Sequence, residues 1–173
     1  MNKVRKKIEP YILPICLILV LAFTRLIPHP SNFTPVLALG IFSGFYFRNF
    51  ILSFFIVISS MFIGDLFLGF HNTMFFTYSS LAVAVLVGIF LKNFGTLGIT
   101  LGGLASSIAF FLVTNFGAWV TLDMYEKNFE GLIQSYFLAI PFFHNTLIST
   151  FLYLFLIKII FELLLKKRVA INN

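Results

Sequence analysis

Long apolar runs, broken by short polar turns, follow one another along almost the whole of this 173-residue sequence. Hydrophobic residues make up 60% of the chain and charged residues only 10%, against roughly 45–50% and about 25% in average soluble domains. The mean hydropathy is +1.01. A small soluble domain leaves much of its surface exposed, so a domain of this size could not bury that many apolar residues. The composition excludes a soluble enzyme, a disordered protein and a disulfide scaffold, and it predicts an integral membrane protein.

The length limits the number of membrane spans, because each span needs about 20 apolar residues. We predict one all-α membrane domain over residues 1–173, with six spans at about 11–27, 33–47, 51–70, 73–91, 96–120 and 142–161. Pro141 interrupts the last apolar stretch, since proline removes a backbone donor and clashes with the turn before it. The segment at about 130–140 is therefore expected to lie near the membrane surface. The basic start and the apolar run after it imitate a signal peptide, but no small-residue cleavage site follows, so we expect the first span to be retained.

The distribution of Lys and Arg predicts the orientation of these spans, because cytoplasmic loops carry an excess of basic residues. With six spans, both termini share one side with the loops after the second and fourth spans. That side collects ten of the twelve basic residues: Lys3, Arg5, Lys6, Lys7, Arg48, Lys92, Lys158, Lys166, Lys167 and Arg168. Both termini are thus predicted to be cytoplasmic. The net charge is +6, and the basic residues are expected to contact anionic lipid head groups rather than nucleic acid.

Polar residues within the spans gather on the opposite, outer side. Such residues are costly in a bilayer and usually face the bundle interior or a water-filled cavity. Asp65, the only mid-span carboxylate, lies roughly 7–8 Å from the outer end of its helix at 1.5 Å per residue. The candidate substrate-binding residues in this outer layer are Arg25, His29, Asn32, Asp65, His71, Tyr78, Asn115, Trp119, His144 and Asn145. A channel would need polar lining along its whole length, so this layer favours a pocket open to the extracytoplasmic side.

Structural explanations exist for several of these residues. Asp65 and Arg25 could form an ion pair that only joins two helices, and each histidine could be an interface residue at a helix end. Trp119 fits an aromatic belt at the membrane surface as well as a ligand platform. Gly40 and Gly44, spaced as Gly-x-x-x-Gly, indicate close helix packing.

No motif predicts catalysis or a resident cofactor. The three histidines and Asp65 have no H-x-x-x-H or paired-carboxylate spacing that would fix a metal on one helix face, so no metal site is predicted. The sequence contains neither a G-x-S-x-G element nor a phosphate-binding loop. We therefore expect a protein that is not an enzyme.

Four segments carry a resemblance to a known family: Arg25–Pro35 (R-x-x-P-H-P-x-N-F-T-P), Gly64–His71, Thr114–Trp119 and Pro141–Thr146. Together they resemble a bacterial family of small membrane proteins labelled as transport proteins, over about residues 25–150. The resemblance implies a multi-pass protein of the bacterial cytoplasmic membrane.

More distantly, the plan is similar to the substrate-binding S components of energy-coupling-factor vitamin transporters, which are six-helix bundles with cytoplasmic termini. That similarity implies an energising transporter module as a partner. The S components often carry an Ala-x-x-x-Ala docking signature in the first helix, where this chain has only Ala22. A solitary transporter and one with a different partner therefore stay open.

The sequence thus favours a transport protein or substrate-binding subunit that captures a small polar or aromatic, vitamin-like solute. Arg25 would bind an anionic group or hold Asp65, the Asn115 and Asn145 amides would orient the solute, and Trp119 and Tyr78 would stack on it. The loop around His29 would act as a lid. The alternatives are a structural subunit of a larger envelope complex and, less favoured, a membrane enzyme.

Overall fold

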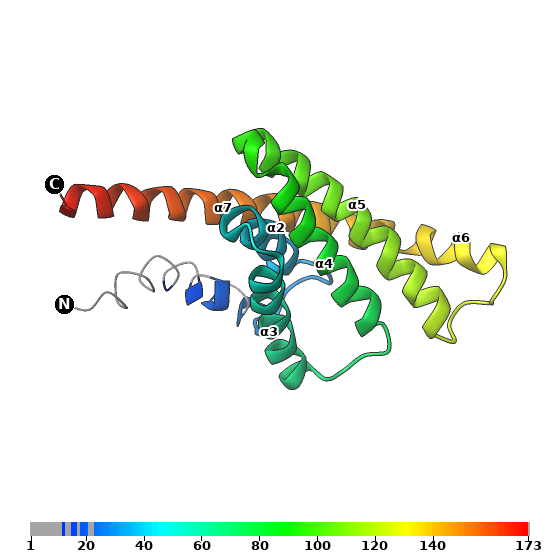
Figure 1. Ribbon diagram of the computed structural model, residues 1–173. Helices are drawn as coiled ribbons and strands as arrows, with labels where there is room; N and C mark the ends of the chain where they lie inside the picture. Colours follow the sequence, from blue (N-terminus) through cyan, green and yellow to red (C-terminus); the bar gives the residue numbers. More distant parts are fainter. Residues whose placement is uncertain (1–11, 13–14, 17, 21–22, 173) are drawn as a thin grey trace.

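The protein is built from helices joined by short loops (Figure 1). The computed structural model describes residues 12, 15–16, 18–20 and 23–172, and side chains as far as residue 163. Within these residues there is no strand. The elements are η1 (Thr24–Leu26), α2 (Val36–Phe47), α3 (Phe50–Leu68), α4 (Met74–Leu91), η2 (Lys92–Phe94), α5 (Gly95–Thr121), α6 (Phe129–Leu138) and α7 (Ile140–Asn172). The all-helical fold predicted from the composition is therefore confirmed for the described part of the chain.

Within the described part of the chain, three helical stretches are long and apolar enough to cross a membrane: Phe50–Leu68, Met74–Thr121 and Ile140–Leu163. The middle stretch has 48 residues and folds back on itself at η2, so that α4 and α5 lie side by side. Gly95 follows η2 with a φ of +56°, a conformation that glycine adopts at little cost where the chain reverses. The apolar helix α2 has only 12 residues, fewer than the roughly 20 that a membrane span needs.

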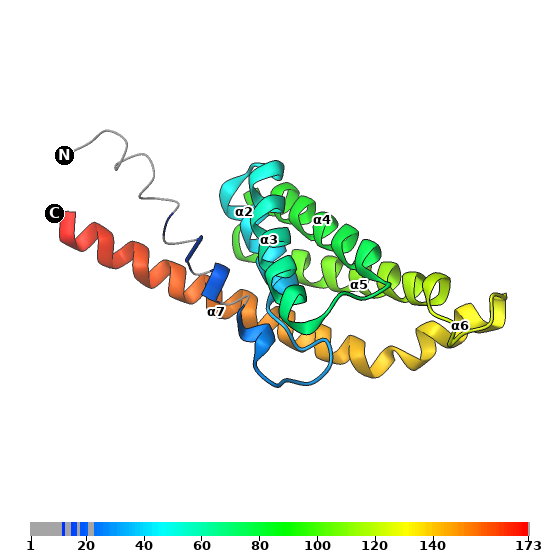
Figure 2. The ribbon, with the colours of Figure 1, turned by 90° about the horizontal axis from the view of Figure 1, so that it is seen from below.

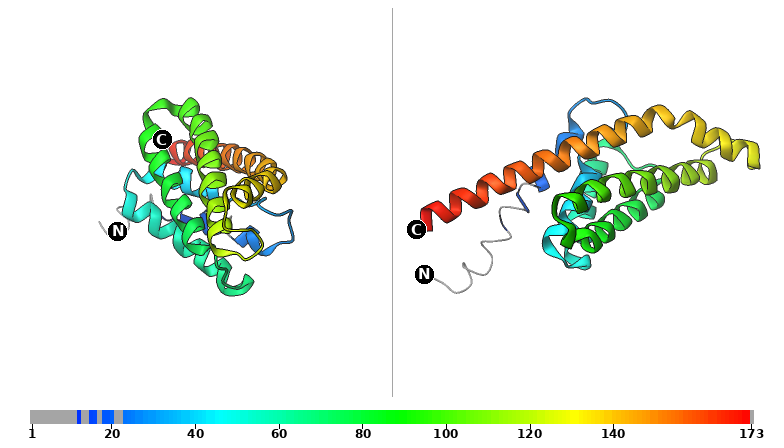
Figure 3. Two further views of the ribbon diagram at one scale, coloured as in Figure 1. Left: turned by 90° about the vertical axis from the view of Figure 1, so that its right-hand side faces the viewer. Right: turned by 90° about the horizontal axis from the view of Figure 1, so that it is seen from above.

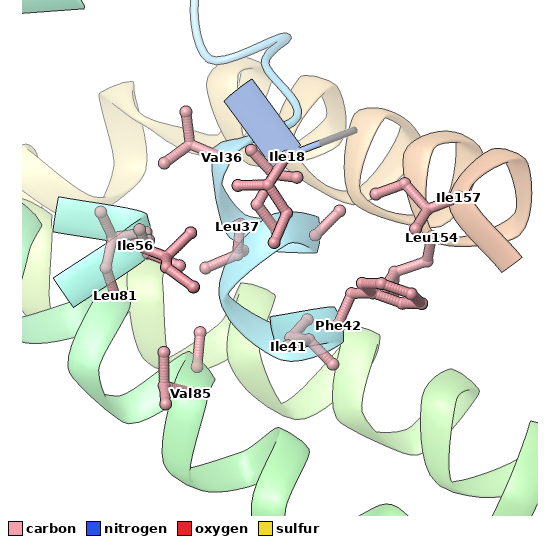
Figure 4. Close-up of a cluster of buried hydrophobic side chains, with 14 of the residues drawn as sticks. Ile18, Val36, Leu37, Ile41, Phe42, Ile56, Leu81, Val85, Leu154 and Ile157 are labelled. Atoms are coloured by element: carbon pink, nitrogen blue, oxygen red, sulfur yellow. The ribbon is translucent and has the colours of Figure 1, made fainter. Parts of the chain in front are cut away.

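The short helix α2 lies at the centre of the molecule. All residues from Val36 to Gly44 are buried, and α2 packs against α3, α4, α5 and α7. Figure 4 shows Leu37 and Ile41 of α2 within a cluster that also contains Leu81 of α4 and Leu154 of α7. The hydrophobic core is thus organised around one helix that the others surround.

Close contact between α2 and α4 depends on glycine. A Cβ atom at Gly44 would overlap the carbonyl oxygen of Val85, and one at Gly88 would overlap that of Ile41. A Cβ at Gly40 would lie 3.1 Å from Ala84 Cβ. Small residues let helix backbones approach in this way, which is the packing role predicted for Gly40 and Gly44.

Large apolar side chains cover the outward faces of the helices. Phe55 on α3, Phe75 and Phe90 on α4 and Leu97 on α5 are all exposed. Soluble monomers rarely show large continuous apolar patches, so these faces are suited to contact with lipid.

The chain breaks between α6 and α7, close to the break predicted at Pro141. Helix α6 (Phe129–Leu138) corresponds to the segment predicted at 130–140. It is capped by Asn128, whose side chain accepts a hydrogen bond from Gly131 N at 2.8 Å. Pro141 is the second residue of α7, in the first turn, where its missing N–H is not needed. Helix α7 has 33 residues and continues well past the predicted end near 161, and its far end projects beyond α2–α5 (Figures 2 and 3).

The predicted first span, about 11–27, lies partly outside the described residues. Ile12, Ile15, Cys16, Ile18–Val20 and Phe23 are helical, and η1 follows at Thr24–Leu26. Ile18 is fully buried in the core beside α2 and α7 (Figure 4).

Candidate functional site

A cavity of about 430 Å³ lies at the end of the bundle where α3 and α5 end and α4 begins. This volume falls within the roughly 300–1,000 Å³ of typical small-molecule sites. Its polar lining residues are Arg25, His29, Asn32, Thr34, His71, Thr73, Thr77, Thr114, Asn115, Thr146, Ser149 and Thr150. Its apolar lining residues are Val36, Leu37, Met61, Leu68, Leu81, Phe110, Ala118 and Leu122. The cavity therefore combines an apolar wall with many hydrogen-bonding groups from η1, α4, α5, α7 and two loops.

Arg25 is the charged residue at the cavity wall, and it is held from behind by α3. Its Nη1 lies 3.0 Å from Asp65 Oδ1 and donates a 3.2 Å hydrogen bond to the carbonyl oxygen of Met61. Asp65 Oδ2 accepts a 2.7 Å hydrogen bond from the Tyr78 hydroxyl. The contact at Oδ1 has the distance of an ion pair but not the angles of a hydrogen bond. Asp65 thus supports the guanidinium and does not itself line the cavity.

The ion pair between Arg25 and Asp65 is strong because both side chains are largely buried. The side chain of Asp65 is 1% exposed and that of Arg25 is 12% exposed. A buried charge is tolerated when its partner is close, and removal of one partner then becomes costly. Gly64 contributes by being small, because a Cβ there would lie only 2.7 Å from Arg25 Nη1. The Gly64–Asp65 pair in the sequence therefore makes both the space and the counter-charge for Arg25.

The loop from Ile27 to Pro35 runs beside α7 (Figure 2), and its residues His29, Asn32 and Thr34 line the cavity. Asn145 Nδ2 donates to the carbonyl oxygen of Ser31 at 3.0 Å, and the Ser149 hydroxyl donates to that of Asn32 at 3.3 Å. His29 lies in the same loop, with Nδ1 2.9 Å from the carbonyl oxygen of Pro30 and Nε2 3.2 Å from that of Arg25. Asn145 thus positions the loop that was predicted to be a lid and does not line the cavity.

Two more predicted residues line the cavity from other sides. Asn115 on α5 donates from Nδ2 to the carbonyl oxygen of Phe111 at 2.8 Å, and no described residue hydrogen-bonds to its Oδ1. His71 lies in the loop before α4, where its Nδ1 is 2.8 Å from the Thr73 hydroxyl. With Arg25, His29 and Asn32, five of the ten predicted residues therefore border one cavity.

The remaining predicted residues have structural partners away from the cavity. Trp119 Nε1 donates to the carbonyl oxygen of Glu126 at 2.9 Å, which ties the end of α5 to the loop before α6. His144 Nδ1 lies 3.2 Å from the carbonyl oxygen of Ile140, within α7. Tyr78 binds Asp65 and borders a separate apolar groove between α3 and α4. Neither Trp119 nor Tyr78 lines the cavity, so their positions do not favour the stacking role expected for them.

The α7 wall contains hydroxyl residues that the sequence reasoning missed. Thr146, Ser149 and Thr150 line the cavity, and a fourth missed residue, Thr77, lines it from α4. The spacing i, i+3, i+4 places the three α7 residues on one helix face, which was a usable signal. Thr146 donates to the carbonyl oxygen of Phe142, whereas the fully buried Thr150 hydroxyl has no hydrogen-bond partner among the described residues.

The arrangement is suited to binding. Among the described residues no cluster of His, Cys, Asp or Glu is close enough to hold a metal ion. The described residues give the cavity one cationic group, two side-chain amides, several hydroxyls and two imidazoles around an apolar wall. Such a set can orient a small molecule that is partly polar and partly apolar.

The fold and the cavity thus define an all-helical, apolar protein with a small-molecule-sized site at one end of its bundle. The chain belongs to a protein family described as "Family of unknown function (DUF6580)", whose sequence pattern matches residues 5–171. No curated protein and no solved structure matches the chain.

Proposed function

We propose that this protein is a membrane-embedded, solute-binding transport protein or transporter subunit. It captures a small polar or aromatic solute in the cavity between η1, α3, α5 and α7. The observation that carries the proposal is the cavity itself, because residues from η1, five helices and the loops next to them converge on one space of ligand size.

The proposal includes six membrane spans, both termini in the cytoplasm and a location in a bacterial cytoplasmic membrane. Three apolar helical stretches support membrane insertion, and the reversal at η2 would divide the middle one into two antiparallel spans. Helix α2 and the first predicted span would complete the six. Because ten of twelve Lys and Arg residues fall on one predicted side, the cavity would open on the other, extracytoplasmic side.

A thermal-shift screen tests the solute site. The purified chain in detergent is heated with water-soluble vitamins, their precursors and nucleobases, since a ligand that binds only the native state raises the unfolding temperature. We expect a rise of several degrees with at least one compound. Asn115→Ala should lose this rise because it removes an amide from the cavity wall, and Asp65→Ala should lose it because Arg25 loses its support.

Thr100→Ala is a matched control for Asn115→Ala. Thr100 lies on the same helix and also donates to a carbonyl four residues earlier, but it does not line the cavity. The control should keep the ligand-induced rise. A rise that persists in Asn115→Ala and Asp65→Ala would contradict this site, and no rise with any compound would favour the structural-subunit alternative.

The proposal contains no catalytic step, so the solute should leave the protein unchanged. Mass spectrometry of the solute after incubation tests this point against the membrane-enzyme alternative. The proposed partner is an energising transporter module that drives transport. If the isolated chain transports the solute in vesicles, no such module is required.

A further inference from the structure

The guanidinium of Arg25 offers N–H donors along more than one edge, and the described residues engage only its Nη1. All of its hydrogen bonds and its ion pair in the described part of the chain involve Nη1, which faces Met61 and Asp65. Arginine has five N–H donors, of which Nε carries one and Nη2 two. These three donors have no partner among the described residues, although the Arg25 side chain is only 12% exposed.

From this geometry we infer that the solute carries a carboxylate, which binds the Nε/Nη2 edge of Arg25 in the cavity. The inference rests on the proposed function and specifies the chemical class of the solute. A carboxylate matches two parallel N–H donors and forms a bidentate, charge-assisted contact. Asp65 holds the opposite edge, so the guanidinium is already oriented when the solute arrives.

The charges around the cavity favour a carboxylate over a phosphate. Among the described residues that line the cavity, Arg25 is the only Lys or Arg, and none is Asp or Glu. A dianion would bring more negative charge than one guanidinium, already shared with Asp65, can neutralise. A monoanionic carboxylate adds one negative charge beside the Arg25–Asp65 pair where a dianion adds two, and no described Asp or Glu lines the cavity to repel it at close range.

Thr150 provides a second anchor on another wall. It is fully buried, lines the cavity on α7, and its hydroxyl has no partner among the described residues. Other hydroxyls in these helices, such as those of Thr114 and Thr146, bond to their own backbone. A buried polar group without a partner is costly, so this hydroxyl is suited to a neutral hydrogen-bonding group of the solute.

The test compares matched acids and neutral analogues on the full chain in detergent. The pairs are nicotinate and nicotinamide, pantothenate and pantothenyl alcohol, biotin and biotinamide, and 4-aminobenzoate and 4-aminobenzamide. We expect at least one acid to raise the unfolding temperature and to bind about tenfold or more tightly than its neutral analogue, as a charge-assisted bond predicts. Inorganic phosphate at the same concentration should give no rise.

Two sets of variants assign the anchors. The double variant Arg25→Gln, Asp65→Asn removes both charges together and should bring the ratio of acid to neutral affinity to about one. Thr150→Val should weaken both members of a pair by a similar factor, whereas Thr100→Val, whose hydroxyl bonds to Thr96 and does not line the cavity, should not.

The outcomes separate this inference from the proposed function. If a neutral analogue binds as tightly as its acid, or the double variant keeps the acid preference, the solute site stands and the carboxylate assignment is overturned. A phosphate-induced rise would also overturn it, and full affinity in Thr150→Val would overturn the second anchor. If no member of any pair binds, the proposed function fails and the inference fails with it.

Discussion

At the residue scale, the pair of Arg25 and Asp65 connects the stability of the protein to its site. Asp65 is buried between Tyr78 on one side and Arg25 on the other, and Arg25 borders the cavity. Either charge alone would be left in a medium of low polarity without a counter-charge. The two residues should therefore tolerate joint replacement better than single replacement.

A double-mutant cycle tests this coupling. Arg25→Gln alone should lower the free energy of unfolding by about 3–5 kcal/mol, because it leaves the Asp65 carboxylate buried and unpaired. The double variant Arg25→Gln, Asp65→Asn should recover most of this loss. Thermal unfolding in detergent without ligand measures both effects, and additive losses would show that the two residues act independently.

Removal of the unpartnered Thr150 hydroxyl is expected to raise the stability of the protein, whereas removal of the Arg25 charge is expected to lower it. Thr150→Val keeps the shape of the side chain and removes a buried hydroxyl that has no partner among the described residues. The ligand-free variant should be more stable by about 1–3 kcal/mol, the cost of an unsatisfied buried polar group. Thr146→Val loses an existing hydrogen bond to Phe142 and should show no such gain in thermal unfolding. Equal changes in the two variants would contradict the assignment.

The site could be predicted from the sequence only in part, because hydropathy gives the depth of a residue and not its direction around the helix. Depth alone grouped Tyr78 with Asn115, but Tyr78 faces α3 and a separate groove while Asn115 faces the cavity. The cluster of Thr146, Ser149 and Thr150 was missed because hydroxyl residues weaken an apolar pattern very little. Their shared face becomes visible only when helical spacing is considered.

At the scale of the elements, apolar runs located most helices closely. The segments expected at 51–70, 73–91 and 96–120 correspond to Phe50–Leu68, Met74–Leu91 and Gly95–Thr121, since each run ends at a polar turn. The last helix was expected to end near 161 but runs to Asn172. Its final residues include Leu, Lys and Glu, which favour helix without being apolar throughout, so hydropathy could not show its end.

The α2–α4 contact gives a prediction for packing. Gly44→Ala should destabilise the protein by about 1–3 kcal/mol or more, because its Cβ would overlap the Val85 backbone, which cannot rotate away. Gly102→Ala is the control, since its nearest neighbour is a side-chain methyl of Ile41 at 3.3 Å. Thermal unfolding of both variants in detergent measures the difference. A smaller loss for Gly44→Ala than for Gly102→Ala would contradict the close approach.

At the scale of the whole molecule, the proposed topology assigns each loop to a side of the membrane. In a Cys16→Ser background, Asn72→Cys and Asp123→Cys should react with a membrane-impermeant maleimide in intact cells. Asn93→Cys, at η2, should react only after the cells are opened. All three positions are exposed in the folded chain, so access to the reagent depends on the side of the membrane. The reverse labelling pattern would place the cavity on the cytoplasmic side.

The central position of α2 has a consequence for biosynthesis. At 1.5 Å per residue its 12 residues measure about 18 Å, whereas the hydrocarbon core of a bilayer is about 30 Å thick. Nearly all of its side chains contact other helices in the finished protein, so lipid would not be its final neighbour. In the proposed membrane setting, α2 is too short to be integrated independently by the insertion machinery. We expect it to enter the bilayer together with α3 and to reach its final place when α4 arrives, which makes assembly of this protein dependent on the order of synthesis.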